Sequence, residues 1–206
     1  NPDAVFIMRT NVDDKTNGDA VQAEALKFGR SVFVPRTEAE GGVPISNAIG
    51  IKPNLTSRGT WQNKGYTVEG TMGVITDARF VEGLIESVKE LGAASEQFHI
   101  RETNSADDEM VVGGYTDMAE RQGATLKVNS TSATYIDESE LTWKYIEDGY
   151  WFKNIPYLYP FNAPDSFLLN VAKFKTHGMG VTLASKNMQG MICHNYQAFC
   201  SGYSLN

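Results

Sequence analysis

The stretch VITDARFVEGLIESVKELGAASEQFHIR, residues 74–101, decides the fold class of this chain. Apolar residues recur at helical spacing from Phe80 to Leu91, after Thr76 and Asp77, either of which suits a helix cap. Gly92 suits the end of that helix, and an apolar strand pattern follows at residues 98–101. The stretch therefore predicts a helix that leads directly into a strand.

Strand and helix patterns continue on both sides of this stretch. Residues 47–54 read NAIGIKPN, in which Ala48, Ile49 and Ile51 suit a buried strand; Pro53 ends it, because proline donates no backbone hydrogen bond. A helix is predicted at 110–122, ending at Gly123, with strands at 125–128 and 166–171. This alternation predicts an α/β, Rossmann-like fold with a mainly parallel central sheet flanked by helices.

The chain before residue 47 is expected to add a strand at 5–8 and a helix that Asp19 caps and that runs to Phe33. A surface loop follows at 35–44, and a second, longer loop is expected at 56–73. We expect residues 1–206 to form a single α/β domain.

Residues 130–164 depart from the alternation and are rich in aromatic side chains. One interpretation is that these side chains pack against the main sheet. The other is an aromatic-rich insertion, a hairpin or lid, that walls a substrate pocket. The aromatic residues are Trp143, Tyr145, Tyr150, Trp151, Phe152, Tyr157, Tyr159 and Phe161.

Composition limits the classes of function. A net charge of −7 argues against general nucleic-acid binding, which needs a basic surface. No apolar run approaches the roughly 18 residues of a membrane span. No Gly-x-Gly-x-x-Gly follows a strand and no Walker phosphate loop is present, so the common nucleotide-binding fingerprints are missing.

The two cysteines, Cys193 and Cys200, are too few for a four-cysteine cluster, so we expect no iron–sulfur cluster in this chain. Three interpretations stay open: two thiols, a disulfide if the protein is exported, or a metal site with His194. The disulfide needs Cα atoms no more than about 7 Å apart. Of the other histidines, His99 is expected to be structural, whereas His177 is a candidate base or ligand.

Polar side chains follow three predicted strands. Lys52 and Asn54 end the first, Glu102 ends the second, and Lys173 follows the third. Because open parallel sheets bind ligands beyond the carboxyl ends of their strands, we expect these groups to share one edge. The acidic run at 107–109 is interpreted as a helix cap rather than a metal site.

The segment KFKTHGMGVTLASKNMQG, residues 173–190, carries the strongest chemical signal. Three lysines within a short stretch of an acidic protein predict a positive pocket for phosphate or carboxylate. Thr182 and Lys186 stand at helical spacing in this interpretation, after a glycine-flanked turn that could offer backbone N–H groups to an anion. The plainer alternative is a solvated loop.

These motifs, IKPN at 51–54 and KFKTH followed by VTLASKNMQG at 173–190, resemble family 362 of the domains of unknown function over residues 47–193. The resemblance implies no reaction, so an enzymatic role stays undecided. Some relatives carry an iron–sulfur ferredoxin domain or a twin-arginine export leader. Relatives also continue beyond the segment that ends at Gly190, so the resemblance implies a chain that is incomplete at its C-terminus. The export leaders imply a location that is either extracytoplasmic, after removal of a leader, or cytoplasmic.

Two hypotheses follow from the residues and the resemblance. The first is a protein that binds or transforms a small anionic ligand. His177, Glu102 and Lys175 are its candidate catalytic residues, and its candidate ligand-binding residues are Lys52, Asn54, Lys173, Thr176, Thr182, Lys186 and Asn187. The second is an exported, non-catalytic binding or assembly protein that forms an oligomer through the aromatic-rich region. No cofactor and no metal ligand are predicted by either.

Overall fold

A four-stranded parallel sheet forms the centre of the computed structural model, which describes residues 5–55, 74–103, 113–129, 137–150, 152–177 and 180–193. The strand order is β5–β4–β3–β8, and all three pairings are parallel. The strands are β3 (Ala48–Pro53), β4 (Phe98–Thr103), β5 (Thr125–Asn129) and β8 (Ser166–Val171). The sheet matches the predicted strands and confirms the predicted α/β class.

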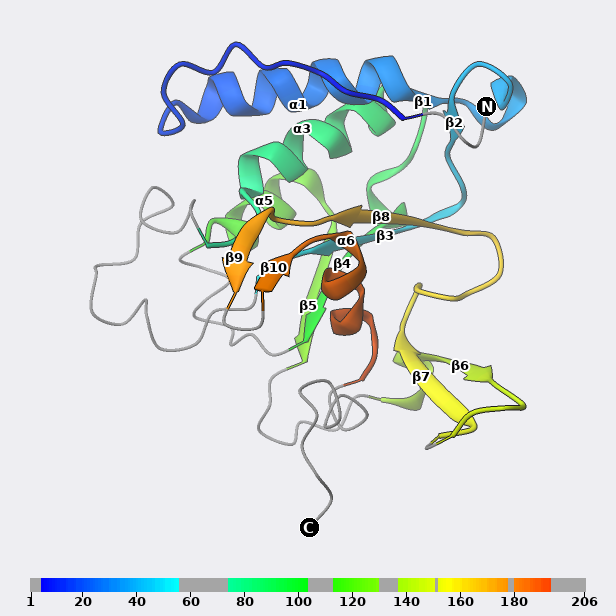
Figure 1. Ribbon diagram of the computed structural model, residues 1–206. Helices are drawn as coiled ribbons and strands as arrows, with labels where there is room; N and C mark the ends of the chain where they lie inside the picture. Colours follow the sequence, from blue (N-terminus) through cyan, green and yellow to red (C-terminus); the bar gives the residue numbers. More distant parts are fainter. Residues whose placement is uncertain are drawn as a thin grey trace.

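Helices α1 (Gly18–Val32) and α3 (Ala78–Lys89) pack against each other on one side of the sheet, with α3 next to the sheet (Figure 1). Helix α5 (Tyr115–Gln122) precedes β5 and ends at Gly123, whose φ of 63° is in the left-handed region that favours glycine. Because α3 is sandwiched between α1 and the sheet, its apolar residues Val81, Ile85 and Val88 are completely buried. These residues join Ile49, Ile51, Phe98 and Ile100 in the main core.

Strand order reverses between β3 and β8, and this reversal positions the site. From β3 the chain passes through α3 to β4 and through α5 to β5, always moving to the same side. Strand β8 instead joins the opposite side of β3, with Lys52 opposite Asn170 and Pro53 opposite Val171. In open α/β sheets, such a reversal leaves a crevice at the carboxyl ends of the two strands.

Smaller elements surround this sheet. They are β1 (Phe33–Val34) paired with β2 (Val43–Pro44), β6 (Leu141–Tyr145) paired with β7 (Asn154–Leu158), β9 (Lys175–His177) paired with β10 (Gly180–Thr182), the short helix α6 (Ala184–Asn187), and the 3-10 turns η1 (Arg36–Glu38), η2 (Ser95–Gln97), η3 (Glu138–Glu140) and η4 (Met188–Met191). The β9–β10 and β6–β7 pairs are antiparallel.

The aromatic tract divides between buried and exposed side chains. Phe161 is 2% exposed and packs with Leu158 and Met191, apart from the main core. In contrast, Trp143 and Tyr150 are 44% and 86% exposed. The oligomer expected to form through these exposed aromatic side chains stays a prediction.

Three expectations for local structure were wrong. Residues 5–8 form no strand, and Val5 and Ile7 are 84% and 92% exposed. An apolar run becomes a strand only when a neighbour completes its hydrogen bonds, and no described strand pairs with this one. The cap of α1 is Asn17, whose side chain accepts from the backbone N–H of Ala20, not Asp19. The helix expected to span 110–122 starts at Tyr115, after Gly114; residues 104–112 lie outside the described ranges.

Candidate functional site

The carboxyl ends of β3 and β4 meet in a buried ion pair between Lys52 and Glu102. The ammonium nitrogen of Lys52 lies 2.6 Å from Oε2 of Glu102, and both side chains are at most 2% exposed. Lys52 also donates to the carbonyl oxygen of Pro53 at 2.6 Å and to Oδ1 of Asn187 at 3.4 Å. All three ammonium hydrogens of Lys52 therefore have acceptors within the protein.

Glu102 is satisfied by backbone donors as well as by Lys52. The N–H of Leu55 donates to Oε2 at 3.0 Å, and the N–H of Thr103 donates to Oε1 at 2.8 Å. Burial raises the pKa of Glu102, and the charge of Lys52 and the backbone donors oppose that shift. Burial likewise lowers the pKa of Lys52, opposed by Glu102. Because its hydrogen bonds are complete, this pair joins β3 to β4 rather than facing solvent.

Asn187, at the end of α6, connects the helix to two strand ends. Its amide nitrogen donates to the carbonyl oxygen of Lys52 at 2.9 Å and to Oδ1 of Asn170 at 2.7 Å. Asn170 in turn donates to the carbonyl oxygen of Ala184 at 2.9 Å. The two asparagines therefore hold α6 against β3 and β8.

The backbone at Gly190 packs closely against the same cluster. A Cβ atom at this position would lie 2.3 Å from Oε1 of Glu102 and 2.4 Å from Cε of Lys52. Real Cβ atoms do not approach other atoms so closely, so position 190 has room only for glycine unless the ion pair moves. The KNMQG segment at 186–190 thus contributes its Asn and its Gly to the buried cluster.

Thr76 joins the ends of β3 and β8 at the reversal point. Its hydroxyl accepts from the N–H of Asn54 at 2.9 Å and donates to the carbonyl oxygen of Val171 at 2.6 Å. Its backbone N–H donates to the carbonyl oxygen of Asn54 at 2.9 Å. Asn54 is 3% exposed, and its side-chain oxygen has no hydrogen-bond partner in the described part of the chain.

Three lysines lie outside this buried layer, and the charges of two of them act on the third. Lys173, Lys175 and Lys186 are all partly exposed. Burial lowers the pKa of Lys175, Glu102 raises it, and the charges of Lys173 and Lys186 lower it further. Lys175 also donates to the carbonyl oxygen of Val74 at 2.6 Å, which ties β9 to the segment before α3.

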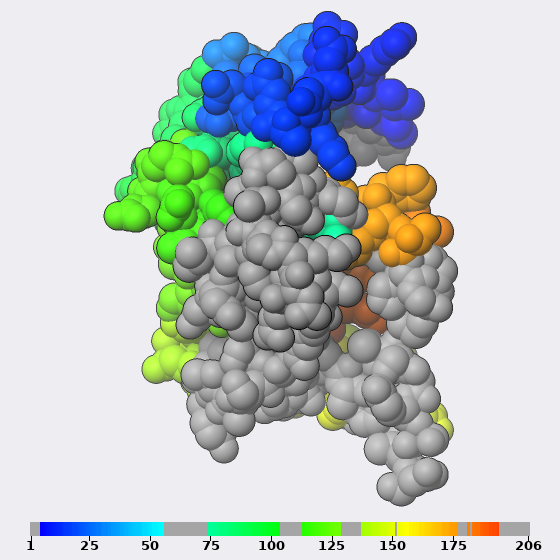
Figure 2. All heavy atoms as spheres, turned by 90° about the vertical axis from the view of Figure 1, so that its left-hand side faces the viewer, coloured from blue at the N-terminus to red at the C-terminus, as the bar shows by residue number. Residues whose placement is uncertain are grey.

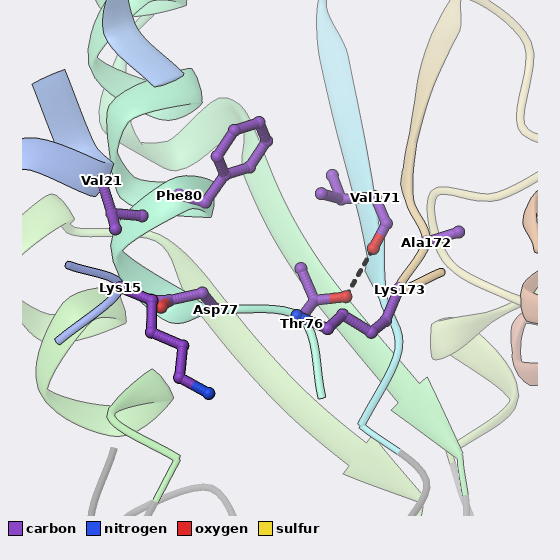
Figure 3. Close-up of a pocket in the computed structure, with 8 residues that line it drawn as sticks. All are labelled: Lys15, Val21, Thr76, Asp77, Phe80, Val171, Ala172 and Lys173. Carbon is purple, nitrogen blue, oxygen red and sulfur yellow. Dashed lines mark hydrogen bonds between the residues drawn. The ribbon is translucent and has the colours of Figure 1, made fainter. Parts of the chain in front are cut away.

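A pocket of about 290 Å³ lies at the reversal point (Figure 3). Figure 3 shows the Lys173 side chain running toward Thr76, with Phe80 and Val171 above them and Lys15 and Asp77 to one side. Burial lowers the pKa of Lys173, Asp77 raises it, and the charge of Lys15 lowers it. The lining residues are Lys15, Val21, Thr76, Asp77, Phe80, Val171, Ala172 and Lys173.

Lys15 lines the pocket, and Arg79 holds the segment that carries it. The guanidinium of Arg79 donates to the carbonyl oxygens of Thr16 and Lys15, at 3.2 and 3.4 Å, while it pairs with Asp77 at 2.7 Å. Asp77 also caps α3 by accepting from the N–H of Arg79. Figure 2 turns this end of the molecule toward the viewer, with the N-terminal segment at the top and the β9 segment at the right.

The predicted site residues therefore fall into two groups. Lys52, Glu102 and Asn187 meet in the buried cluster; Lys173, Lys175 and Lys186 form the outer group. Asn54 belongs to neither group and lies next to Thr76. Thr176 is exposed on β9, opposite Val181 of β10.

The helical position expected for Thr182 was wrong. Thr182 lies in β10 opposite Lys175, and α6 begins only at Ala184. Strands β9 and β10 form an antiparallel pair before the helix starts. Of His177 and Thr182 only the backbone is described. His194, Cys200, Trp151 and the 56–73 and 107–109 segments lie outside the described residues, so the expectations for them, including the disulfide, stay predictions.

Residue-by-residue reasoning missed three contributors to this edge. Asn170 sits at the end of an apolar strand, and its polarity there was a usable signal. Gly190 ends a motif but carries no chemistry of its own. Lys15 lies in a polar coil far from every motif, so nothing in the sequence pointed to it.

The described ranges contain no candidate metal site and no helix suited to span a membrane. There, no group of three or more His, Cys, Asp or Glu side chains is arranged to hold a metal ion. No helix in those ranges has the length and apolarity needed to cross a bilayer.

The fold and this edge define an α/β protein with a lysine-lined pocket where the strand order of a parallel sheet reverses. The chain belongs to the family described as Domain of unknown function (DUF362), which matches residues 49–204. That match includes the strand ends, α3 and the KNMQG segment. Neither the curated proteins nor the solved structures contain a match to this chain.

Proposed function

We propose that this protein binds a small anionic ligand at the carboxyl edge of its parallel sheet. The observation that carries the proposal is the pocket at the β3–β8 reversal, which Lys15 and Lys173 line. Its volume of about 290 Å³ is at the lower end of the range for small-molecule sites. A carboxylate or phosphate group is the complement of two ammonium groups.

The two acids near the pocket are already paired with other cations, although Asp77 also raises the pKa of Lys173. Asp77 is engaged by Arg79 and by the start of α3, and Glu102 is engaged by Lys52. Within the described part of the chain, Lys15, Lys173 and Lys186 form no ion pair. These three lysines therefore concentrate positive charge at one edge of a chain whose net charge is −7.

The buried cluster supports this edge in the proposed function. Lys52, Glu102 and Asn187 fix the ends of β3 and β4 and the position of α6, so they are positioning residues for the outer lysines. Burial lowers the pKa of both Lys175 and Lys173, and Lys175 remains the candidate for a proton transfer on a bound ligand. Thr176, Thr182 and His177, on β9 and β10, remain candidates for ligand contact.

Thermal unfolding in the presence of anions tests the proposal. We expect inorganic phosphate or acetate to raise the unfolding midpoint of the wild-type chain, because a ligand that binds the folded state stabilises it. Lys173→Gln should weaken binding about 10- to 100-fold, the loss expected for one charge-assisted hydrogen bond.

Lys153→Gln is the matched control, since Lys153 is an exposed lysine on β7's side of the molecule and lines no pocket. The control should bind anions like the wild type. A midpoint that no anion moves, or an equal loss in both variants, would count against the proposed function.

A further inference from the structure

The walls of the reversal-point pocket are apolar on the side of the helices. Val21 comes from α1, Phe80 from the first turn of α3, and Val171 from the last position of β8. All three side chains are partly exposed, and Phe80 and Val171 pack against the margin of the main core. The pocket lining therefore combines apolar side chains with two lysines. Figure 3 shows Phe80 and Val171 above Thr76 and Lys173, and the Lys15 side chain running downward at the left.

The other polar groups in the lining are already committed to the protein. The hydroxyl of Thr76 both accepts from Asn54 and donates to Val171. The carboxylate of Asp77 accepts from the backbone of Arg79 and pairs with its guanidinium. In the described ranges, the ammonium groups of Lys15 and Lys173 make no hydrogen bond, and an ammonium can only donate.

The composition of the pocket lining indicates which class of ligand it fits. A polyhydroxylated ligand such as a sugar needs several donors and acceptors, which Thr76 and Asp77 do not have to spare, and it gains little from Phe80. A bare inorganic anion would use the lysines and leave the apolar wall uncovered. An anionic head with an apolar body uses both parts of the lining.

We propose that this pocket selects amphiphilic anions: a carboxylate or phosphate head held by Lys15 and Lys173, with an aliphatic or aromatic body against Phe80, Val21 and Val171. The inference rests on the proposed function, because it assigns the ligand class of the same site. It adds that the apolar body, and not the charge alone, determines which anion is bound.

Isothermal titration with two pairs of probes tests this selectivity on the unmodified chain. Acetate is compared with hexanoate, and inorganic phosphate with hexyl phosphate, so that each pair shares its head group and the two pairs distinguish carboxylate from phosphate. We expect the longer member of the preferred pair to bind at least about tenfold more tightly, since each buried methylene contributes to affinity.

A variant pair assigns that gain to the wall. Phe80→Leu should reduce the preference for the longer probe about three- to tenfold, because it shrinks the apolar wall. Phe28→Leu is the control, since Phe28 also packs partly buried against the main core but lines no part of the pocket. The control should keep the full preference.

The outcomes separate this inference from the proposed function. If short and long probes bind equally and Lys173→Gln weakens both, the anion site stands and the amphiphilic selectivity is wrong. If the long probes bind better but Lys173→Gln has no effect, the apolar body binds elsewhere and the inference also fails. If no probe binds, both proposals fail.

Discussion

Gly190 and the buried pair below it show how single residues shape this edge. Lys52 and Glu102 satisfy each other and the backbone around them, and the backbone at Gly190 passes so close that a methyl group has no space. From the sequence, both charged residues could be assigned to the carboxyl edge. That they would pair with each other depends on side-chain directions that spacing alone does not determine.

Gly190→Ala is expected to destabilise the protein. The added methyl group must push Glu102 or Lys52 out of the ion pair, and overpacking of this kind costs about 1–3 kcal/mol in the free energy of unfolding. Gly41→Ala is the control, because a Cβ there would meet its nearest atom at 3.4 Å, an ordinary contact. Urea unfolding measures both; equal stability of the two variants would mean that the cluster tolerates the methyl group.

Strand β4 carries two polar side chains that pack together, His99 and Arg101. Nη2 of Arg101 lies 3.2 Å from Nδ1 of His99, whose ring packs edge-to-face on Tyr159 at 5.2 Å. Since a guanidinium can only donate, Nδ1 must accept, and His99 is therefore neutral. Burial, and then the charges of Arg101 and Lys127, lower the pKa of His99 to about 4. This supports the structural role that its place in a strand predicted.

The neutral His99 makes stability depend on pH. Its pKa is lower in the folded state than its ordinary value of 6.5, so the stabilisation is complete above pH 6.5 and is lost as the pH falls through about 4. Because His99 is only half-buried, solvent screens part of this effect, so the loss should be well below the roughly 3 kcal/mol that a shift of this size implies at about 1.4 kcal/mol per pKa unit. Denaturant unfolding at several pH values should show a steeper acid decline for the wild type than for His99→Gln. Parallel declines would contradict this assignment.

The elements themselves were largely predictable from the sequence. The strand β3, the helix α3 and the strand β8 each combine a continuous apolar pattern with a clear end signal, such as Pro53 or Gly92. The isolated run at 5–8 was misassigned, because its pattern says nothing about a partner strand. The turn into β9 and β10 was missed because the glycines there were interpreted as the lead-in to a helix.

At the scale of the whole molecule, topology assembles the site from distant segments. Lys15 precedes α1, Asp77 begins α3 and Lys173 follows β8, yet all three line one pocket. The general location followed from the parallel sheet alone, since ligands bind beyond the carboxyl ends of strands. The presence of Lys15 in the lining could not be predicted from the sheet, because it depends on Arg79 anchoring the segment before α1.

The central claim, that Lys15 and Lys173 hold an anionic head group, is tested most directly by footprinting the lysines. The folded chain is reductively methylated with and without saturating hexyl phosphate, and the modification of each lysine is quantified by mass spectrometry. We predict that the ligand slows modification of Lys15 and Lys173 at least about tenfold, in line with the affinity of one charge-assisted contact, and leaves the exposed Lys153 unchanged. If bound hexyl phosphate left the modification rates of Lys15 and Lys173 unchanged, the claim that these lysines hold the head group would be contradicted.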